Sequence, residues 1–153
     1  MSADYTIRRA TVDDVAIVTH QRVGMFIDMG IDAARTQAMA APFTDWLNER
    51  FNNGTYLGWL AVADEQVVAG AGLWLYEWIP SPLAPDTTRG YILNVYTERD
   101  YRKQGIARAL VETILAYCVE HKIRVALLHA SKEGRPIYTA LGFVQTNEMR
   151  KDL

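Results

Sequence analysis

The chain has 153 residues, half of them hydrophobic, which is enough to bury the core of one ordinary domain. Its formal net charge of −2 argues against a broad nucleic-acid surface and against a polybasic membrane anchor, because both need an excess of Lys and Arg. Met1 to Ala10 lacks the apolar core of a signal peptide, and no run reaches the roughly 20 apolar residues that span a bilayer. The lone Cys118 excludes an internal disulfide and suits a reducing compartment. We therefore expect one cytoplasmic domain over residues 1–153, with no nucleic-acid or membrane partner.

The first third of the chain predicts a strand and two helices. Tyr5 to Arg9 alternates enough for a strand, and Thr11 then stands as an N-cap with Asp14 in the first helical turn. The apolar spacing places these residues on the inner face of that first helix: Val12, Val15, Ala16, Thr19 and Val23. A second helix is expected over about residues 33–51, where Pro42 predicts either a kink or two short helices.

The connection between those two helices is unusually apolar. Five apolar residues fall within seven positions there: Met25, Phe26, Ile27, Met29 and Ile31. They are either the end of a helix and part of the core, or the wall of a substrate pocket that prefers an amine bearing an apolar group.

The middle of the chain predicts an antiparallel hairpin followed by a loop. Thr55–Ala63 and Val67–Trp78 are strand-like runs separated by three polar residues. Gly70 and Gly72 lie two apart, so they point to one face and indicate a bulge or a close approach by a helix. Three prolines then make 79–90 a loop, which is either a surface connection or functional.

A strand pattern over Tyr91–Tyr96 turns into a helix pattern from Ile106 onward. The start of a helix leaves backbone N–H groups without partners and carries a partial positive charge, so it suits an anion. Gly105 and Ala107 keep bulky side chains away from the amides of residues 103–108. Residues 99–108 contain one acidic residue, Asp100, and four cationic ones: Arg99, Arg102, Lys103 and Arg108. The sequence therefore predicts a local anion site that could hold a diphosphate.

The C-terminal third predicts two strands around a short helix. Ile123–Ala130 is a continuous apolar strand, parallel to Tyr91–Tyr96 by the usual crossover rule. Ser131 is expected to cap a helix that contains Pro136 and ends at Leu141-Gly142. Residues 143–151 then predict a last strand.

Two segments resemble the GCN5-related N-acetyltransferases, the GNAT family. Arg102-Lys103-Gln104-Gly105-Ile106-Ala107 is similar to the family signature R/Q-x-x-G-x-G/A, and residues 131–143 resemble its C-terminal Y-x-x-x-G-F segment. The resemblance implies a single α/β (α+β) domain with a mixed, mostly antiparallel sheet and helices on both faces. It also implies a bulge in the central strand and a splayed pair of parallel strands, the fourth and fifth, with a slot for acyl-CoA between them.

The resemblance also implies which residues contact acetyl-CoA, the expected cosubstrate. The backbone of the central strand would hold the pantetheine arm, and the amides at the helix start would hold the diphosphate. The implied contact residues are Val95, Tyr96, Thr97, Arg102, Lys103, Gln104, Gly105, Ile106, Ala107, Arg108 and Ser131. The chain departs from the commoner family pattern at Ser131, where many relatives have asparagine, and at Gly134, where many have alanine.

Catalysis by the family's route would transfer acetyl directly to a primary amine of a small molecule or peptide, in a ternary complex. Tyr138 matches the family tyrosine that protonates the departing thiolate, and a strand amide near Val95 would polarise the thioester carbonyl. Relatives often dimerise, so a homodimer is possible. There are plainer interpretations of both features. Tyr138 could be a core residue that packs on the sheet, and the basic bend could be an ordinary surface connection between a strand and a helix.

Three further points stay open at the level of sequence. No general base is assigned: Glu77 and Glu98 are the nearest carboxylates, and ordered water is a further route for the proton. The three histidines show no metal-ligand spacing, and of them His129 alone is placed where it could face the site. An acyl-CoA sensor without turnover is the main alternative to an enzyme, and Tyr138 favours the enzyme. A phosphate-loop nucleotide-binding domain is disfavoured because G-x-x-x-x-G-K-[ST] is absent.

Overall fold

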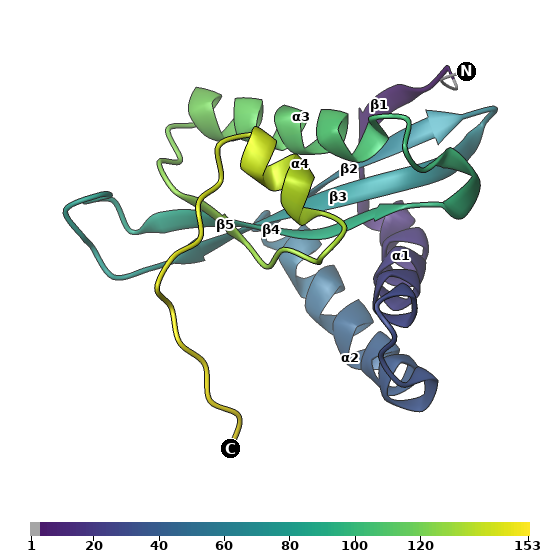
Figure 1. Cartoon of the computed structure of the whole chain (residues 1–153), viewed down its shortest axis with the longest axis horizontal. Coiled ribbons are helices and arrows are strands. Elements are labelled where there is room, and N and C mark those ends of the chain that lie inside the picture. Colours follow the sequence, from purple (N-terminus) through teal and green to yellow (C-terminus); the bar gives the residue numbers. More distant parts are fainter. Residues whose placement is uncertain (1–3) are drawn as a thin grey trace.

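In a computed structural model, a five-stranded sheet lies between two pairs of helices (Figure 1). The structure describes residues 4–153, so Met1 to Ala3 of the N-terminal stretch considered above lie outside it. The strands follow one another across the sheet in chain order: β1 (Thr6–Arg9), β2 (Tyr56–Ala63), β3 (Gln66–Glu77), β4 (Thr88–Thr97) and β5 (Ala126–Leu128). Neighbouring strands are antiparallel except β4 and β5, which are parallel.

Helices cover both faces of this sheet. Figure 1 shows α1 (Val15–Asp28) and α2 (Ala33–Asn52) on one face, and α3 (Ile106–Glu120) and α4 (Arg135–Ala140) on the other. Two short 3-10 helices, η1 (Val12–Asp14) and η2 (Arg99–Tyr101), precede α1 and α3. The predicted fold class, with its mostly antiparallel sheet and its parallel strand pair, is confirmed. Within residues 4–153, no helix combines the length and the apolar character that a membrane crossing requires.

The alternation of side chains along β2 divides the core into two. Leu57, Trp59 and Ala61 pack with α3 on one face, whereas Tyr56 and Leu60 pack with α1 and α2 on the other. The turn of the β2–β3 hairpin has both central residues, Asp64 and Glu65, at positive φ, as a tight two-residue hairpin turn requires.

The inner face of α1 differs from the predicted one. Val15, Val18 and Gln21 are buried, whereas Val12 is 50% exposed. The prediction did not include Gln21, because its side chain is polar, yet the buried stripe of α1 continues through it. Gly70 explains how Gln21 fits, because a Cβ at Gly70 would overlap Gln21 Oε1 and lie 2.9 Å from Leu60 Cδ2. The close approach by a helix is therefore confirmed for Gly70, whereas Gly72 makes room for the ring of Tyr56 on β2. The bulge that the two glycines also indicated is present between β3 and β4.

Several predicted boundaries need correction. The apolar residues Met25, Phe26 and Ile27 belong to α1 rather than to a connection. α2 continues through Pro42 as one helix, so the interpretation as two short helices is wrong. β4 begins at Thr88, earlier than predicted.

The C-terminal part departs further from the prediction. The strand expected over Ile123–Ala130 is reduced to the three residues of β5. The last strand expected over 143–151 is absent from the described structure, where the segment after Phe143 runs away from the body (Figure 1). The sheet of the described residues ends at β5, and the side chains of Val144 and Met149 are 82% and 93% exposed.

The start of α1 depends on one carboxylate. Thr11 and Asp14 form a capping box across η1, and Arg8 donates hydrogen bonds of 2.8 Å to both carboxylate oxygens of Asp14. The hydrogen bond from Arg8 is the main reason why the pKa of Asp14 is lowered. A carboxylate with a lowered folded-state pKa stabilises the protein above its unfolded pKa of about 3.9 and loses that contribution as the pH falls through the folded value.

We expect Asp14→Asn to lower the free energy of unfolding by about 1 kcal/mol at pH 7. Urea unfolding at pH 7 and at pH 3 would measure the difference from the wild type, which should shrink at the lower pH. Asp13→Asn is the matched control, because Asp13 lies in the same turn without a side-chain partner among the hydrogen bonds and ion pairs of residues 4–153. An equal loss at both pH values, or an equal loss in the control, would contradict this account.

Candidate active site

A bulge interrupts β4, the fourth of the five strands, near its C-terminal end. In the β3–β4 register Gly70 pairs with Tyr96 and Gly72 pairs with Leu93, so Asn94 and Val95 lie opposite Ala71 alone. Asn94 has a φ of +61°, in the left-handed region that asparagine tolerates better than most residues. The bulge that the family resemblance implied in the central strand is present.

The parallel partner leaves β4 just before this bulge. β4 and β5 pair from Gly90 with Ala126 to Ile92 with Leu128, and no pairing between them is present beyond that point in the described chain. β4 nevertheless continues to Thr97, so the side of residues 93–97 that faces away from β3 is an open strand edge. The N–H and C=O groups of such an edge can pair with an extended ligand as if it were an added strand.

A side chain beside this open edge is suited to a polar ligand. Thr97 Oγ1 is buried and has no hydrogen-bond partner among residues 4–153. Buried polar atoms normally have a partner, so an unpaired one commonly marks a place for a bound group. The amide, carbonyl and hydroxyl groups of a pantetheine arm are of the kind that would satisfy it.

The bend between η2 and α3 presents its backbone to solvent. Lys103 has a φ of +61° and Gly105, the N-cap residue of α3, has a φ of +80°. The first helical bond after the cap runs from the Ala109 N–H to the Gly105 carbonyl at 3.0 Å, so the amides before Ala109 point out of the helix start. No atom lies within 4 Å of a Cβ built at Gly105, which leaves open space in front of those amides.

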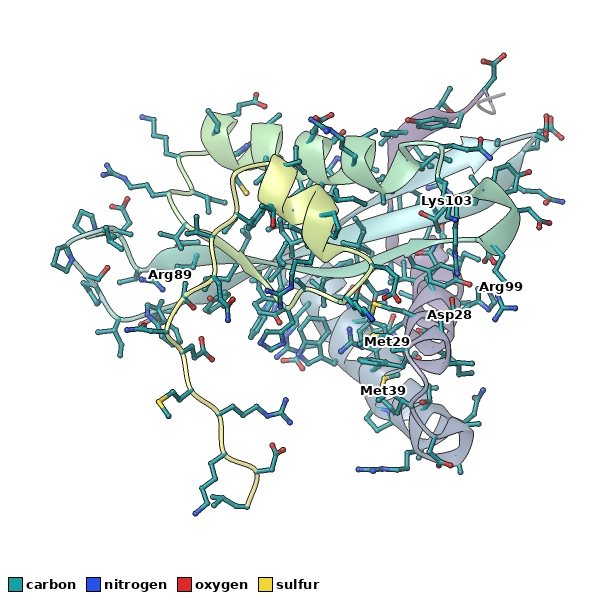
Figure 2. All side chains as sticks on the ribbon, in the orientation of Figure 1. Asp28, Met29, Met39, Arg89, Arg99 and Lys103 are labelled. Carbon is teal, nitrogen blue, oxygen red and sulfur yellow. The ribbon has the colours of Figure 1, made fainter. Side chains whose placement is uncertain are left out.

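Ion pairs change the predicted role of the cationic cluster. Arg99 and Arg102 both bind Asp28 at the end of α1, and Arg102 Nε also donates to the Thr97 carbonyl at 2.8 Å. Figure 2 shows Arg99 close to Asp28, with Lys103 farther along the same bend. The hydrogen bond from Arg102 is the main reason why the pKa of Asp28 is lowered. These two arginines therefore fix the bend to α1.

The other two cations of the cluster differ from each other. Arg108 pairs with Glu112 on the next turn of α3 at 3.0 Å. Lys103 alone of the four forms no ion pair with any residue from 4 to 153, and its ammonium group is exposed. Three of the four cations are therefore paired with carboxylates in the described chain, and whether they also contact a diphosphate stays a prediction.

Tyr138 lies in the first turns of α4, where its ring is buried in the α3-side core. The ring meets Phe143 edge to face at 5.9 Å, and burial raises the pKa of the Tyr138 phenol. A phenol with a raised pKa stays protonated at neutral pH and is available as a proton donor.

The two departures from the family pattern adjoin this tyrosine. Ser131 Oγ accepts a hydrogen bond of 3.0 Å from the Gly134 N–H, so Ser131 organises the turn before α4. A Cβ at Gly134 would lie 2.8 Å from Tyr138 Cε2 and 3.1 Å from Ser131 Oγ. Glycine at this position therefore allows the Tyr138 ring to lie against the turn.

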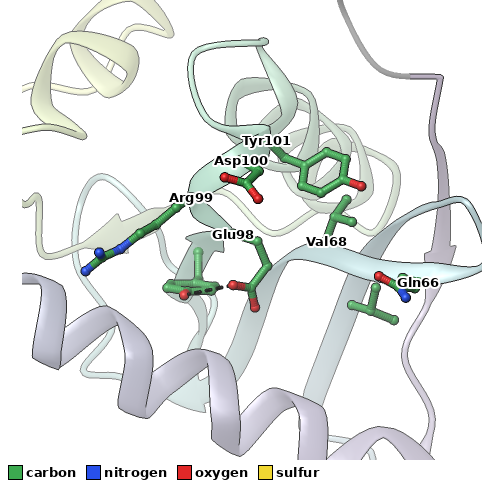
Figure 3. A pocket seen from close by; sticks show the side chains of 8 residues that line it. Gln66, Val68, Glu98, Arg99, Asp100 and Tyr101 are labelled. Atoms are coloured by element: carbon green, nitrogen blue, oxygen red, sulfur yellow. Dashed lines mark hydrogen bonds between the residues drawn. The ribbon is translucent and has the colours of Figure 1, made fainter.

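The candidate bases lie in three different places. Glu77 is exposed at the end of β3, in a hollow with Trp78, and Glu98 lies in a groove beside β3 (Figure 3). Glu98 is already bonded there, to the Tyr96 hydroxyl at 3.3 Å and to His20 Nε2 at 3.1 Å. Neither hollow includes a residue of β5 or α4 among its described walls.

His129 is the candidate base at the open edge. It directly follows β5, at the point where the two parallel strands cease to pair. Its ring meets the Tyr91 ring edge to face at 5.6 Å.

Sequence reasoning missed two residues on the α1 side of the bulge. Asn94 is 3% exposed, and its amide donates to the Val18 carbonyl at 3.0 Å. Arg22 Nη1 donates to Asn94 Oδ1 at 3.2 Å. Two features of the sequence could have indicated these residues. Asn94 is the single polar residue in an apolar strand, and Arg22 follows Val18 by four positions on a predicted helix.

Comparisons with known proteins agree with this arrangement. The model of the Acetyltransferase (GNAT) family matches residues 25–143. A GCN5-related N-acetyltransferase from Ralstonia eutropha JMP134 is 38% identical, with a TM-score of 0.94 over 98% of this chain and 99% of its own. The crystal structure of a predicted acetyltransferase with acetyl-CoA from Clostridium acetobutylicum is 28% identical, with a TM-score of 0.91 over 98% of this chain and 96% of its own.

More distant structures share the fold alone. An acetyltransferase from Trypanosoma brucei is 19% identical, with a TM-score of 0.68 over 98% of this chain and 100% of its own. No curated protein sequence matches the chain. The family match covers most of the chain, and a close structural relative covers nearly all of it. The chain therefore belongs to the GNAT family of acetyltransferases.

Proposed function

We propose that this protein transfers the acetyl group of acetyl-CoA to a primary amine of a small molecule or peptide, by direct attack in a ternary complex. The observation that carries the proposal is the open edge of β4 beside its bulge, which leads to the exposed amides at the start of α3. The related structure with acetyl-CoA supports the choice of cosubstrate. A cytoplasmic location is part of the proposal and is consistent with the free, buried Cys118.

The chain would bind acetyl-CoA mainly through its backbone. The edge groups of Val95, Tyr96 and Thr97 would pair with the pantetheine arm as an added strand does. The amides from Lys103 to Arg108 would receive the diphosphate at the positive end of α3, with the Lys103 ammonium group nearby. Ser131 would act through the turn that places Tyr138.

Each group has a defined part in the transfer. The amine nitrogen attacks the thioester carbonyl carbon, whose oxygen is polarised by a backbone N–H near Val95. As the carbon–sulfur bond breaks, the Tyr138 phenol protonates the departing thiolate, and the amine loses its proton to water or to His129. Tyr138 then regains a proton from solvent. An acyl-CoA sensor would share the groups that bind acetyl-CoA but would not require the Tyr138 phenol as a proton donor.

The first prediction concerns the diphosphate site. Gly105→Glu should weaken acetyl-CoA binding by at least about 100-fold, because it adds a carboxylate in front of the amides that bind the diphosphate. Isothermal titration calorimetry measures this affinity directly.

Gly54→Glu is the matched control for that variant. Gly54 also has a positive φ, +76°, and open space around a Cβ, but it lies at the end of α2. Both variants therefore carry a similar backbone cost, and the control should bind acetyl-CoA normally. Unchanged affinity in Gly105→Glu would exclude this bend as the diphosphate site.

The second prediction concerns Tyr138. Tyr138→Phe removes one hydroxyl and little volume, so kcat should fall by roughly 10²- to 10⁴-fold while the affinity for acetyl-CoA is retained. Since burial raises the pKa of this phenol, the alkaline limb of the wild-type pH–rate profile should lie above the ordinary tyrosine value of about 10. That limb should vanish in the variant.

Tyr117→Phe serves as the control, because Tyr117 packs on Trp59 and His121 along α3, outside the proposed site. A Tyr138→Phe variant with wild-type kcat and an unchanged profile would remove Tyr138 from the mechanism. Acetyl-CoA binding without acetylation of any amine in a broad panel would favour the sensor.

A further inference from the structure

Arg22 is a cation that faces the bulge of β4 from the α1 side. Its guanidinium lies 5.0 Å from the ring centroid of Phe26 and 4.8 Å from that of Phe43, so two aromatic rings hold it. Nη1 donates to Asn94 Oδ1, the bulge residue, and the phenols of Tyr56 and Tyr91 act on it electrostatically. The side chain therefore has a fixed position beside the bulge.

The charge of Arg22 has no counter-ion in the described chain. No carboxylate from residues 4–153 lies within ion-pair distance, and its hydrogen-bond acceptor there is a neutral amide. Its Nε is buried and has no partner among the same residues. Burial lowers the pKa of the guanidinium, but arginine stays protonated at physiological pH. A half-buried positive charge without an anion is costly, so this site is suited to an external anion.

That anion is not the diphosphate of acetyl-CoA. Arg22 precedes Asp28 by six residues on α1, which corresponds to about 9 Å along the helix axis. Asp28 marks where the diphosphate bend is attached through Arg99 and Arg102. Arg22 lies instead beside Asn94, at the bulge where the thioester would react.

We infer that Arg22 binds the carboxylate of the amine acceptor, and that the acceptor is therefore an amino acid or a similar small amine carrying a carboxylate. The inference rests on the proposed function, which places the thioester at the bulge. One guanidinium edge matches the single charge and planar shape of a carboxylate. A phosphate dianion carries two charges, which one guanidinium does not balance, and Arg22 is the cation that is hydrogen-bonded to the bulge residue Asn94.

The surroundings of Arg22 add a preference for an apolar or aromatic side chain on that acceptor. The rings of Phe26 and Phe43 lie over the guanidinium, and the phenols of Tyr56 and Tyr91 are close enough to act on its charge. Met29, labelled in Figure 2, follows the last residue of α1 and is 50% exposed. The apolar end of α1 thus remains a proposed wall of the acceptor site.

The test compares each amino acid with its own carboxamide, at saturating acetyl-CoA, by following thiol release. The carboxamide keeps the side chain and the amine and loses only the negative charge. We expect the wild type to favour the acids of apolar and aromatic residues by about 10- to 100-fold in kcat/KM. A neighbouring carboxylate raises the pKa of an amine, so the acid has less free amine at neutral pH. A preference for it would therefore oppose intrinsic reactivity and would report recognition.

Variants assign that preference to one side chain. Arg22→Met should bring the acid-to-amide ratio close to one, and Arg22→Lys should keep part of it. Because the ratio is internal to each variant, a partly misfolded sample lowers both rates and leaves the ratio unchanged. Arg50→Met is the matched control, since Arg50 also lies over a ring, that of Trp46, but its charge is paired with Glu49.

The outcomes separate this inference from the proposed function. Wild-type protein that acetylates amides as well as acids, or an Arg22→Met variant with the wild-type ratio, would overturn the inference and leave the acetyltransferase intact. Absence of turnover with every amine would count against the proposed function. Calorimetric titration of the same acids into protein saturated with CoA would then decide the inference: binding lost in Arg22→Met supports it, and no binding by the wild type overturns it.

Discussion

The bulge at Asn94 and Val95 is the constraint on which the rest of this structure depends. It places Asn94 at positive φ, a backbone conformation that costs about 1 kcal/mol or more for a residue other than glycine. Two hydrogen bonds of the Asn94 side chain offset that cost by tying β4 to Val18 and Arg22 of α1. The result is a sheet that is fixed on its α1 side and open on its β5 side, which is what a slot for an extended cosubstrate requires.

α1 connects the two ends of the proposed active site. Arg22 of α1 is hydrogen-bonded to Asn94 at the bulge. Asp28, in the last turn of α1, forms ion pairs with Arg99 and Arg102 of the bend that leads into α3. The same helix therefore positions the acceptor side and the diphosphate side relative to each other. Gly105 contributes the left-handed turn, and Tyr138 of α4 is positioned by Gly134 before the helix and Phe143 after it. In the proposed function, backbone geometry would supply most of the cosubstrate site, while the side chains of the proposed acceptor site would come from α1 and α2.

Sequence patterns predicted the elements that depend on residues close together in the chain. The β2–β3 hairpin and α3 with its glycine cap follow from alternation, helical spacing and turn residues close in sequence. The inner face of α1 was misplaced because Gln21 is a polar residue in a buried stripe, made possible only by Gly70 on a distant strand. The pairing of Asp28 with Arg102 joins residues 74 positions apart, so no local rule reveals it. The segment after Phe143 has strand-like composition but no neighbouring strand, and pairing rather than composition decides whether a strand forms.

The central claim is that acetyl-CoA lies along the open edge of β4 and ends at the start of α3. Amide hydrogen exchange with and without saturating acetyl-CoA measures this directly, residue by residue, without requiring the acceptor to be known. The account predicts slower exchange at Val95–Thr97 and across 103–108, with the β2–β3 hairpin unchanged. Unchanged exchange in both segments at saturating acetyl-CoA, or protection confined to the groove of Gln66 and Glu98, would contradict it.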